Sequence, residues 1–139
     1  MTPSPAVIAT ASPSRPAAAT PLPTLASTTV DATAAPPGAI SFKLTEDAGP
    51  RFHPDQATAK AGTVVFFLQN RLNVDAGPFD HNIALGLKLH VPLASSAFIH
   101  AAKSAVFTVA GVAPGTYTFW CQVADHAAKG MVGSLTITP

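Results

Sequence analysis

The sequence predicts an all-β fold: a Greek-key antiparallel β-sandwich or barrel that follows a disordered N-terminal tail. From residue 39 onward, short apolar segments recur at roughly 8–12-residue spacing, with glycine- and proline-rich turns between them, as in such folds. Several segments alternate between apolar and polar residues, as strands with one buried face do. The first 38 residues show neither this alternation nor a helical period. The 139 residues therefore predict one domain of ordinary size behind a tail.

The first predicted strands lie between residues 39 and 70. The segment AISFKLT alternates, so its apolar side chains share one face. A turn at Pro54 leads to a short polar strand, and TVVFFLQN is a continuous apolar run, which favours a buried strand. The apolar face of the first segment consists of Ile40, Phe42 and Leu44.

Later strands follow a loop rich in glycine and proline, NVDAGPFD. Residues 88–104 are expected to form a long connection with at most one helical turn. In TYTFWC, alternation places Tyr117, Phe119 and Cys121 on the core face and Trp120 on the other, partly exposed face. The expected strands are HNIALGL, SAVFTV, TYTFWC and GSLTITP, with a turn at AGVAPG before TYTFWC.

Residues 1–38 are expected to be a disordered linker or tether, and 39–139 the folded domain. The tail holds eight of the 14 prolines, ten alanines and eleven serines and threonines, and its charged residues are Arg15 and Asp31. It has too few large apolar groups to offset the entropy of ordering. In an extended, proline-rich conformation it would reach about 100 Å, which suits a mobile carrier held near its partners.

Composition excludes several classes of function. Charged residues make up 11% of the chain and the net charge is +1, which argues against nucleic acid or an anionic membrane surface as the main partner. The single cysteine excludes an intramolecular disulfide and any metal site that needs several thiolates. No apolar run reaches the roughly 20 residues of a membrane span, and no secretory signal is evident.

The segment WCQVADHAAKGM carries the chemistry, because it contains Cys121, His126 and Met131 at even spacing. A thiolate, an imidazole and a thioether together select copper over hard cations, and over zinc when the thioether takes part. A second histidine is needed, because the blue-copper arrangement is two histidines and a cysteine with a distant axial methionine. His81 is favoured, since it begins an apolar strand after a loop. The other candidates are His53, His90 and His100, which read better as surface histidines.

The run GTYTFWCQVADHAAKGMVGSLTI with the upstream FDHNIAL resembles the cupredoxins, the small type 1 blue-copper proteins. The resemblance covers residues 39–139. Four residues between cysteine and histidine, and four between histidine and methionine, resemble the auracyanin and rusticyanin branches of that family, and the Pro/Ala/Thr-rich tail favours the auracyanin branch.

The resemblance implies a role for each motif residue. His81, Cys121 and His126 would be equatorial ligands of one copper ion, and Met131 the weak axial ligand. Asn82 would hold the ligand loop by hydrogen bonding across to it. Asp80 and Gln122 depart from the family pattern around the site, since a small or apolar residue and a hydroxyl residue are common there. The Asp80 carboxylate would lower the reduction potential.

The resemblance also implies that an electron leaves through the exposed edge of His126, inside a small apolar collar that suits brief docking. Trp120 is a second candidate exit, since it neighbours the copper thiolate. The remaining collar residues are Ala127, Ala128, Pro78 and Phe79.

We therefore expect a monomeric carrier of one electron between larger redox proteins, with no nucleic-acid partner and no small-molecule substrate. Blue-copper carriers work outside the cytoplasm, so the tail is expected to be a mature, exported N-terminus behind a removed anchor, tethering the domain to a membrane. The alternative is a copper trafficking or storage protein, although only two methionines are present. A multicopper enzyme would need further paired histidines, and no His-x-His occurs.

Overall fold

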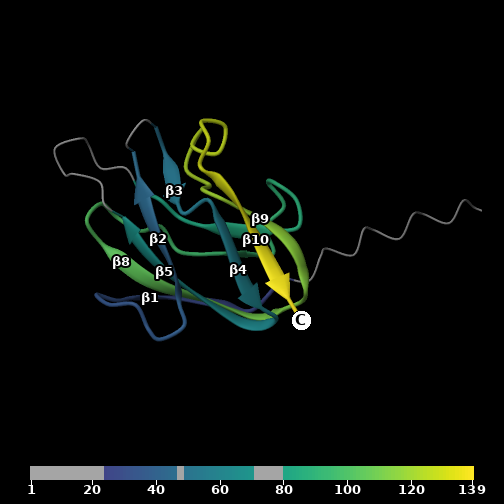
Figure 1. The fold of residues 1–139 in the computed structure, drawn as a ribbon. Coiled ribbons are helices and arrows are strands. Elements are labelled where there is room, and N and C mark those ends of the chain that lie inside the picture. The colour runs from purple at the N-terminus through teal and green to yellow at the C-terminus, as the bar shows by residue number, and fades with distance from the viewer. Residues whose placement is uncertain (1–23, 47–48, 71–79) are drawn as a thin grey trace, which may run out of the picture.

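Two five-stranded β-sheets face each other in the computed structural model, which describes residues 24–46, 49–70 and 80–139 (Figure 1). The predicted all-β sandwich is confirmed. The described residues contain no helix, and therefore no helix long and apolar enough to cross a membrane. The first sheet has the order β1 (Ser27–Asp31), β8 (Ser104–Val112), β5 (Gly62–Asn70), β2 (Ile40–Thr45) and β3 (Arg51–His53). The second has the order β4 (Gln56–Lys60), β10 (Val132–Thr138), β9 (Gly115–Trp120), β6 (Ala84–Gly86) and β7 (Ala94–Ser95).

Each sheet contains one parallel pair among antiparallel ones, a detail that strand patterns did not predict. β2 pairs in parallel with β5, and β4 pairs in parallel with β10. The path of the chain explains the parallel pairs. After β3 in the first sheet, the turn at Pro54 leads the chain to β4 in the second sheet, and the chain then returns to the first sheet as β5. Because β2 and β5 run the same way, both end at the same end of the sandwich.

The core is aromatic and fills the space between the sheets. The predicted alternation of β2 is confirmed for Phe42 and Leu44, which are fully buried. The Phe119 ring lies 4.9 Å from the Phe42 ring and 5.1 Å from the Phe52 ring, measured between centroids, so it joins the two sheets. Burying a phenylalanine side chain contributes about 1.5–3 kcal/mol, so this cluster gives the loops at its end a rigid base.

The folded part begins earlier than expected. β1 lies inside the predicted tail, yet all five of its residues pair with β8. Its side chains are mostly exposed and show no apolar pattern, because an edge strand of this kind is held by backbone hydrogen bonds rather than by burial. The boundary expected at residue 38 is therefore wrong for 27–31, while residues 1–23 of the predicted tail lie outside the described residues.

The connection over residues 88–104 contains turns, β7 and a bridge between Lys88 and Val91 instead of a helical turn. It covers the outer face of β9. Trp120 is only 1% exposed there, and its ring centroid lies 6.1 Å from that of His90. The prediction that Trp120 is partly exposed is thus wrong: alternation placed its side chain away from the core correctly, but a distant segment buries it.

Candidate metal centre

Separate segments bring the predicted ligands to one end of the sandwich. Cys121 directly follows β9, and the loop that starts there returns to β10 through His126 and Met131. His81 precedes β6, which pairs with β9, and is fixed by a bridge to Ile99. In this bridge the His81 N–H donates to the Ile99 carbonyl at 3.1 Å, and the Ile99 N–H donates back at 2.7 Å.

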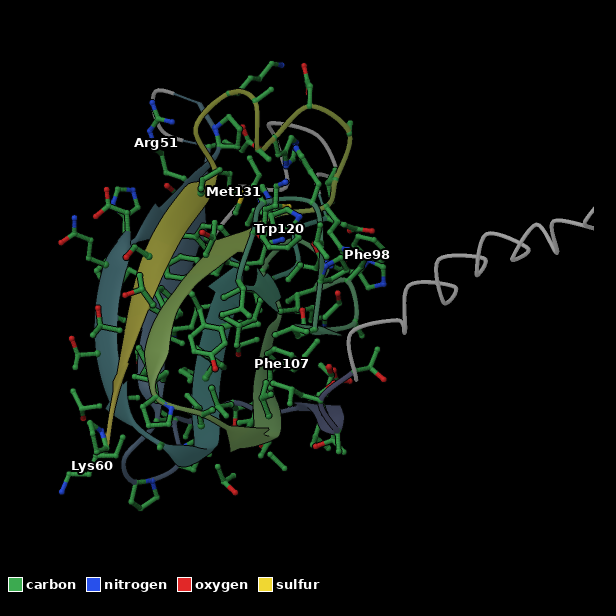
Figure 2. The ribbon with its side chains drawn as sticks, turned by 90° about the vertical axis from the view of Figure 1, so that its right-hand side faces the viewer. Arg51, Lys60, Phe98, Phe107, Trp120 and Met131 are labelled. Carbon is green, nitrogen blue, oxygen red and sulfur yellow. The ribbon has the colours of Figure 1, made fainter. Side chains whose placement is uncertain are left out.

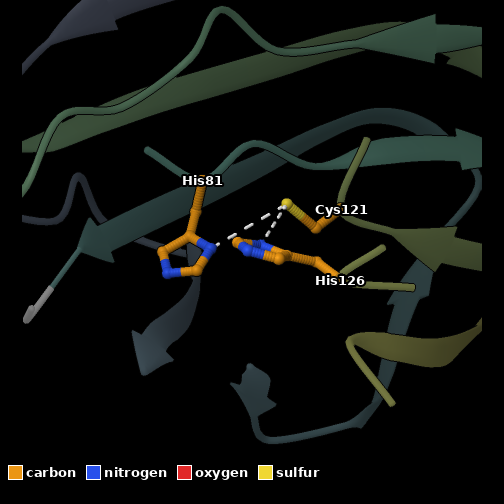
Figure 3. Close-up of side chains that lie close together, drawn as sticks. All are labelled: His81, Cys121 and His126. Atoms are coloured by element: carbon orange, nitrogen blue, oxygen red, sulfur yellow. Dashed lines mark hydrogen bonds between the residues drawn. The ribbon is translucent and has the colours of Figure 1, made fainter. Parts of the chain in front are cut away.

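The two imidazoles direct the same nitrogen toward the thiol (Figure 3). Sγ of Cys121 lies 3.9 Å from Nδ1 of His81 and 3.7 Å from Nδ1 of His126. One donor atom from each of the three residues lies within 4.8 Å of the other two. All three side chains are buried, so a single ion can touch all of them and exclude water.

Hydrogen bonds within the ligand loop fix its shape. The His126 N–H donates to the Val123 carbonyl at 3.0 Å, and the Met131 N–H donates to the His126 carbonyl at 2.9 Å. The Cys121 N–H donates to the Met131 carbonyl at 3.2 Å, which closes the loop at its base. Met131 is fully buried, and Figure 2 shows it at the end of the sandwich opposite Lys60. Met131, the predicted axial ligand, thus lies in the same loop as Cys121 and His126 and is hydrogen-bonded through its backbone to both.

Arg51 supports the loop from the neighbouring sheet. Its Nη1 donates to the Lys129 carbonyl at 2.8 Å. Gly130 follows with a φ of 110°, and a Cβ at this position would collide with the Arg51 guanidinium. Glycine suits this position because L-residues rarely adopt this φ. An added Cβ would also displace the flexible end of the Arg51 side chain from the loop.

Asn82 ties the segment of His81 to the ligand loop. Its Oδ1 accepts from the Gln122 N–H at 2.8 Å, and its Nδ2 donates to Oε1 of Gln122 at 2.8 Å. These bonds are the ones expected of Asn82, and they explain why glutamine serves where a hydroxyl residue was expected: its amide oxygen completes a two-point contact. Asp80 instead pairs with Nδ1 of His100 at 2.8 Å, on the surface.

Burial controls protonation at the site. Burial, and then the nearby His126, lower the pKa of His81 from 6.5 to about 4, although Asp80 acts in the opposite direction. The ring is therefore neutral and able to ligate at neutral pH. Burial raises the pKa of the Cys121 thiol, opposed by the backbone N–H groups of Asn82 and Val123, and the charge of Glu46 raises it further. A bound metal ion would deprotonate this thiol.

Glu46 was not identified as a site residue from the sequence, yet its side chain contacts both histidines of the candidate metal centre. It follows the last residue of β2, and its Oε1 lies 3.4 Å from Nε2 of His81 and 3.6 Å from Nε2 of His126. The position of Glu46 directly after a predicted strand was the one available signal. It could not be used, because the parallel pairing that brings the end of β2 to this end of the sandwich is not evident from strand patterns.

The expected collar is seen only in part. The His126 residue is 5% exposed, Ala127 is half-buried and Ala128 is exposed, so the ligand ring lies just below the surface. Pro78 and Phe79 lie outside the described residues. The surface position expected of His53, His90 and His100 is confirmed, because all three are exposed.

The donor set fits copper. Two imidazoles, a thiol and a thioether are soft or borderline ligands, and this combination is that of a type 1 copper site. Hard cations prefer oxygen ligands, and Glu46, the carboxylate that lies against the two rings among the described residues, faces the Nε2 atoms rather than the Nδ1 atoms directed at sulfur.

Comparison with known proteins agrees with the geometry. Residues 40–138 match the model of the copper binding proteins, plastocyanin/azurin family. A plastocyanin from Prochlorothrix hollandica is 29% identical over 107 residues, covering 75% of this chain and 78% of that protein. A chloroplastic plastocyanin from Oryza sativa subsp. indica is 34% identical over 91 residues, covering 62% and 54%. The crystal structure of dithionite-reduced auracyanin from Roseiflexus castenholzii has a TM-score of 0.62 at 20% identity, covering 73% and 98%, and so shares the fold.

Proposed function

We propose, because the chain belongs to the plastocyanin/azurin family of copper-binding proteins, that it carries one electron at a time between larger redox proteins. His81, Cys121, His126 and Met131 form its type 1 copper site. The observation that carries the proposal is the common direction of the two Nδ1 atoms toward one buried sulfur. Such a site has no open position for a substrate, and the chain is an electron carrier rather than an enzyme.

When bound, copper supplies a Cu(II)/Cu(I) couple that accepts or releases one electron. The protein's part is to hold the ligands in one geometry while the charge changes. Asn82 and Gln122 link the His81 segment to the loop, and Arg51 braces the loop from the other sheet. A ligand set fixed by the fold changes little between the two oxidation states, which favours fast transfer.

We assign the electron exit to His126, whose ring lies just beneath the surface beside Ala127 and Ala128. Small side chains allow close approach by a partner, and a small apolar contact releases quickly. In this proposal the domain is a monomer, and its partners are redox proteins that dock on it transiently. Trp120 does not serve as an exposed exit, because the connection that carries His90 covers it.

We propose an extracytoplasmic location with the tail as a tether to a membrane. The support is the proline-, alanine- and threonine-rich composition of the first 23 residues and the similarity to plastocyanins, one of them named chloroplastic. Cell fractionation of the producing organism tests it: the protein should appear with the membrane or periplasmic fraction, and recovery in the cytoplasmic fraction would contradict the location.

The function is tested by loading the purified protein with Cu(II) and recording its visible and EPR spectra, with Cys121→Ser as the control. An intense blue thiolate-to-copper band and a narrow copper hyperfine splitting are expected in the native protein, and both should be lost in the variant. Reversible one-electron reduction with retention of the ion completes the test. A colourless ion that chelators remove readily would argue for trafficking or storage instead.

A further inference from the structure

The carboxylate of Glu46 lies between the outer nitrogens of both histidine ligands. Its Oε1 is 3.4 Å from Nε2 of His81 and 3.6 Å from Nε2 of His126, and the two rings lie 5.0 Å apart between centroids. Among the described residues, Glu46 makes its ion pairs with these two histidines and none with a lysine or arginine. Its side chain is 22% exposed, so this is no solvated surface charge.

The direction of the rings sets what Glu46 must accept. Each imidazole directs Nδ1 at the Cys121 sulfur, so a ligating ring carries its proton on Nε2. A buried N–H without an acceptor costs about 1–3 kcal/mol. In the described part of the chain, Nε2 of His81 and Oε1 of Glu46 are both buried, and neither has a hydrogen bond of normal geometry. Their separation exceeds a normal N–H···O length by a few tenths of an ångström, so a hydrogen bond would require the glutamate side chain to turn toward the ring.

We propose that Glu46 is a positioning residue of the copper site, whose carboxylate accepts the Nε2–H groups of His81 and His126 and favours Cu(II) over Cu(I). The inference rests on the proposed function and adds to it the residue that sets the reduction potential. A carboxylate on the far nitrogen orients a ligating ring and raises its basicity. One carboxylate serving both rings would fix their relative orientation as well.

The sign of the effect follows from charge. Cu(II) carries one more positive charge than Cu(I), and a negative charge in a buried site stabilises the more positive state more strongly. The carboxylate of Glu46 lies against both rings that would hold the ion, so its charge acts close to the metal position. Asp80 is less suited to this role, because its carboxylate pairs with His100 at the surface.

Glu46→Gln tests the charge while keeping the shape of the side chain. The ratio of Cu(II) affinity to Cu(I) affinity is expected to fall at least tenfold, seen as a rise of about 59 mV or more in the midpoint potential. Asp125→Asn is the matched control. It removes the same charge from the ligand loop, where the carboxylate is exposed and pairs with Lys129, so its potential should move far less.

A second readout needs no copper. In the metal-free wild-type protein, nitrogen-15 NMR of the imidazoles should show both neutral rings protonated on Nε2, and Glu46→Leu should give mixed tautomers. Finding His81 protonated on Nδ1 in the wild-type protein overturns the proposal even if no Glu46 variant folds. An equal potential shift in Glu46→Gln and Asp125→Asn overturns it too. Either outcome can occur while the copper-loaded wild-type protein still shows the blue band. If the proposed function is wrong, the wild-type protein lacks that band, irrespective of the results for the Glu46 variants.

Discussion

Acidification of the metal-free protein is expected to weaken its fold through His81. The pKa of this ring is about 4 in the folded protein, compared with 6.5 for an ordinary histidine, chiefly because the ring is buried. Between these values the unfolded chain binds a proton that the folded chain does not, so stability increases with pH in this window. The contribution is complete above about pH 6.5 and is lost as the pH falls toward 4. One pKa unit corresponds to about 1.4 kcal/mol, so His81 alone accounts for about 3 kcal/mol of lost stability at pH 4.

The assay is urea unfolding of the protein in the presence of a chelator, at intervals from pH 7 to pH 4. Trp120 is the only tryptophan and is buried, so its fluorescence reports unfolding. His81→Asn removes the titrating group and serves as the comparison, because the other ionisable groups are common to both proteins. The difference in unfolding free energy between the two should change by about 3 kcal/mol across this range. Parallel pH profiles would refute the reasoning, since His81 would then titrate alike in both states.

Three further changes test the site and its support. Met131→Gln should keep the blue band but lower the midpoint potential, because an oxygen or nitrogen ligand favours Cu(I) less than a thioether does; an unchanged potential in voltammetry would mean that Met131 is not axial. Gly130→Ala should destabilise the domain by about 1–3 kcal/mol in urea unfolding, because its Cβ meets the Arg51 guanidinium at a φ of 110°; a neutral result would show that the loop yields. Asn82→Ala should cost about 1–3 kcal/mol and weaken copper retention in chelator competition, since it removes two hydrogen bonds to Gln122; loss of stability with unchanged copper retention would restrict Asn82 to a structural role.

The correct sequence predictions came from patterns among neighbouring residues, namely strand alternation and the spacing of the ligand residues. Alternation identified the buried face of β2, and it placed Phe119 and Cys121 on the core face of β9. The spacing of Cys121, His126 and Met131 located the ligand loop, because all three donors lie within one short segment between β9 and β10. His81 needed more, since its place depends on the family motif and not on any spacing to the loop.

Contacts between segments far apart in the chain determined the features that the sequence did not predict. The sequence by itself determined an all-β sandwich with a copper-ligand loop, because alternation and ligand chemistry are properties of neighbouring residues. Only the tertiary structure decided that Trp120 is covered, that Ser27–Asp31 is a strand and that Glu46 reaches both imidazoles. Each of these depends on contacts between segments far apart in the chain. Such contacts are selected by the free energy of packing the whole domain, which no short window of residues contains.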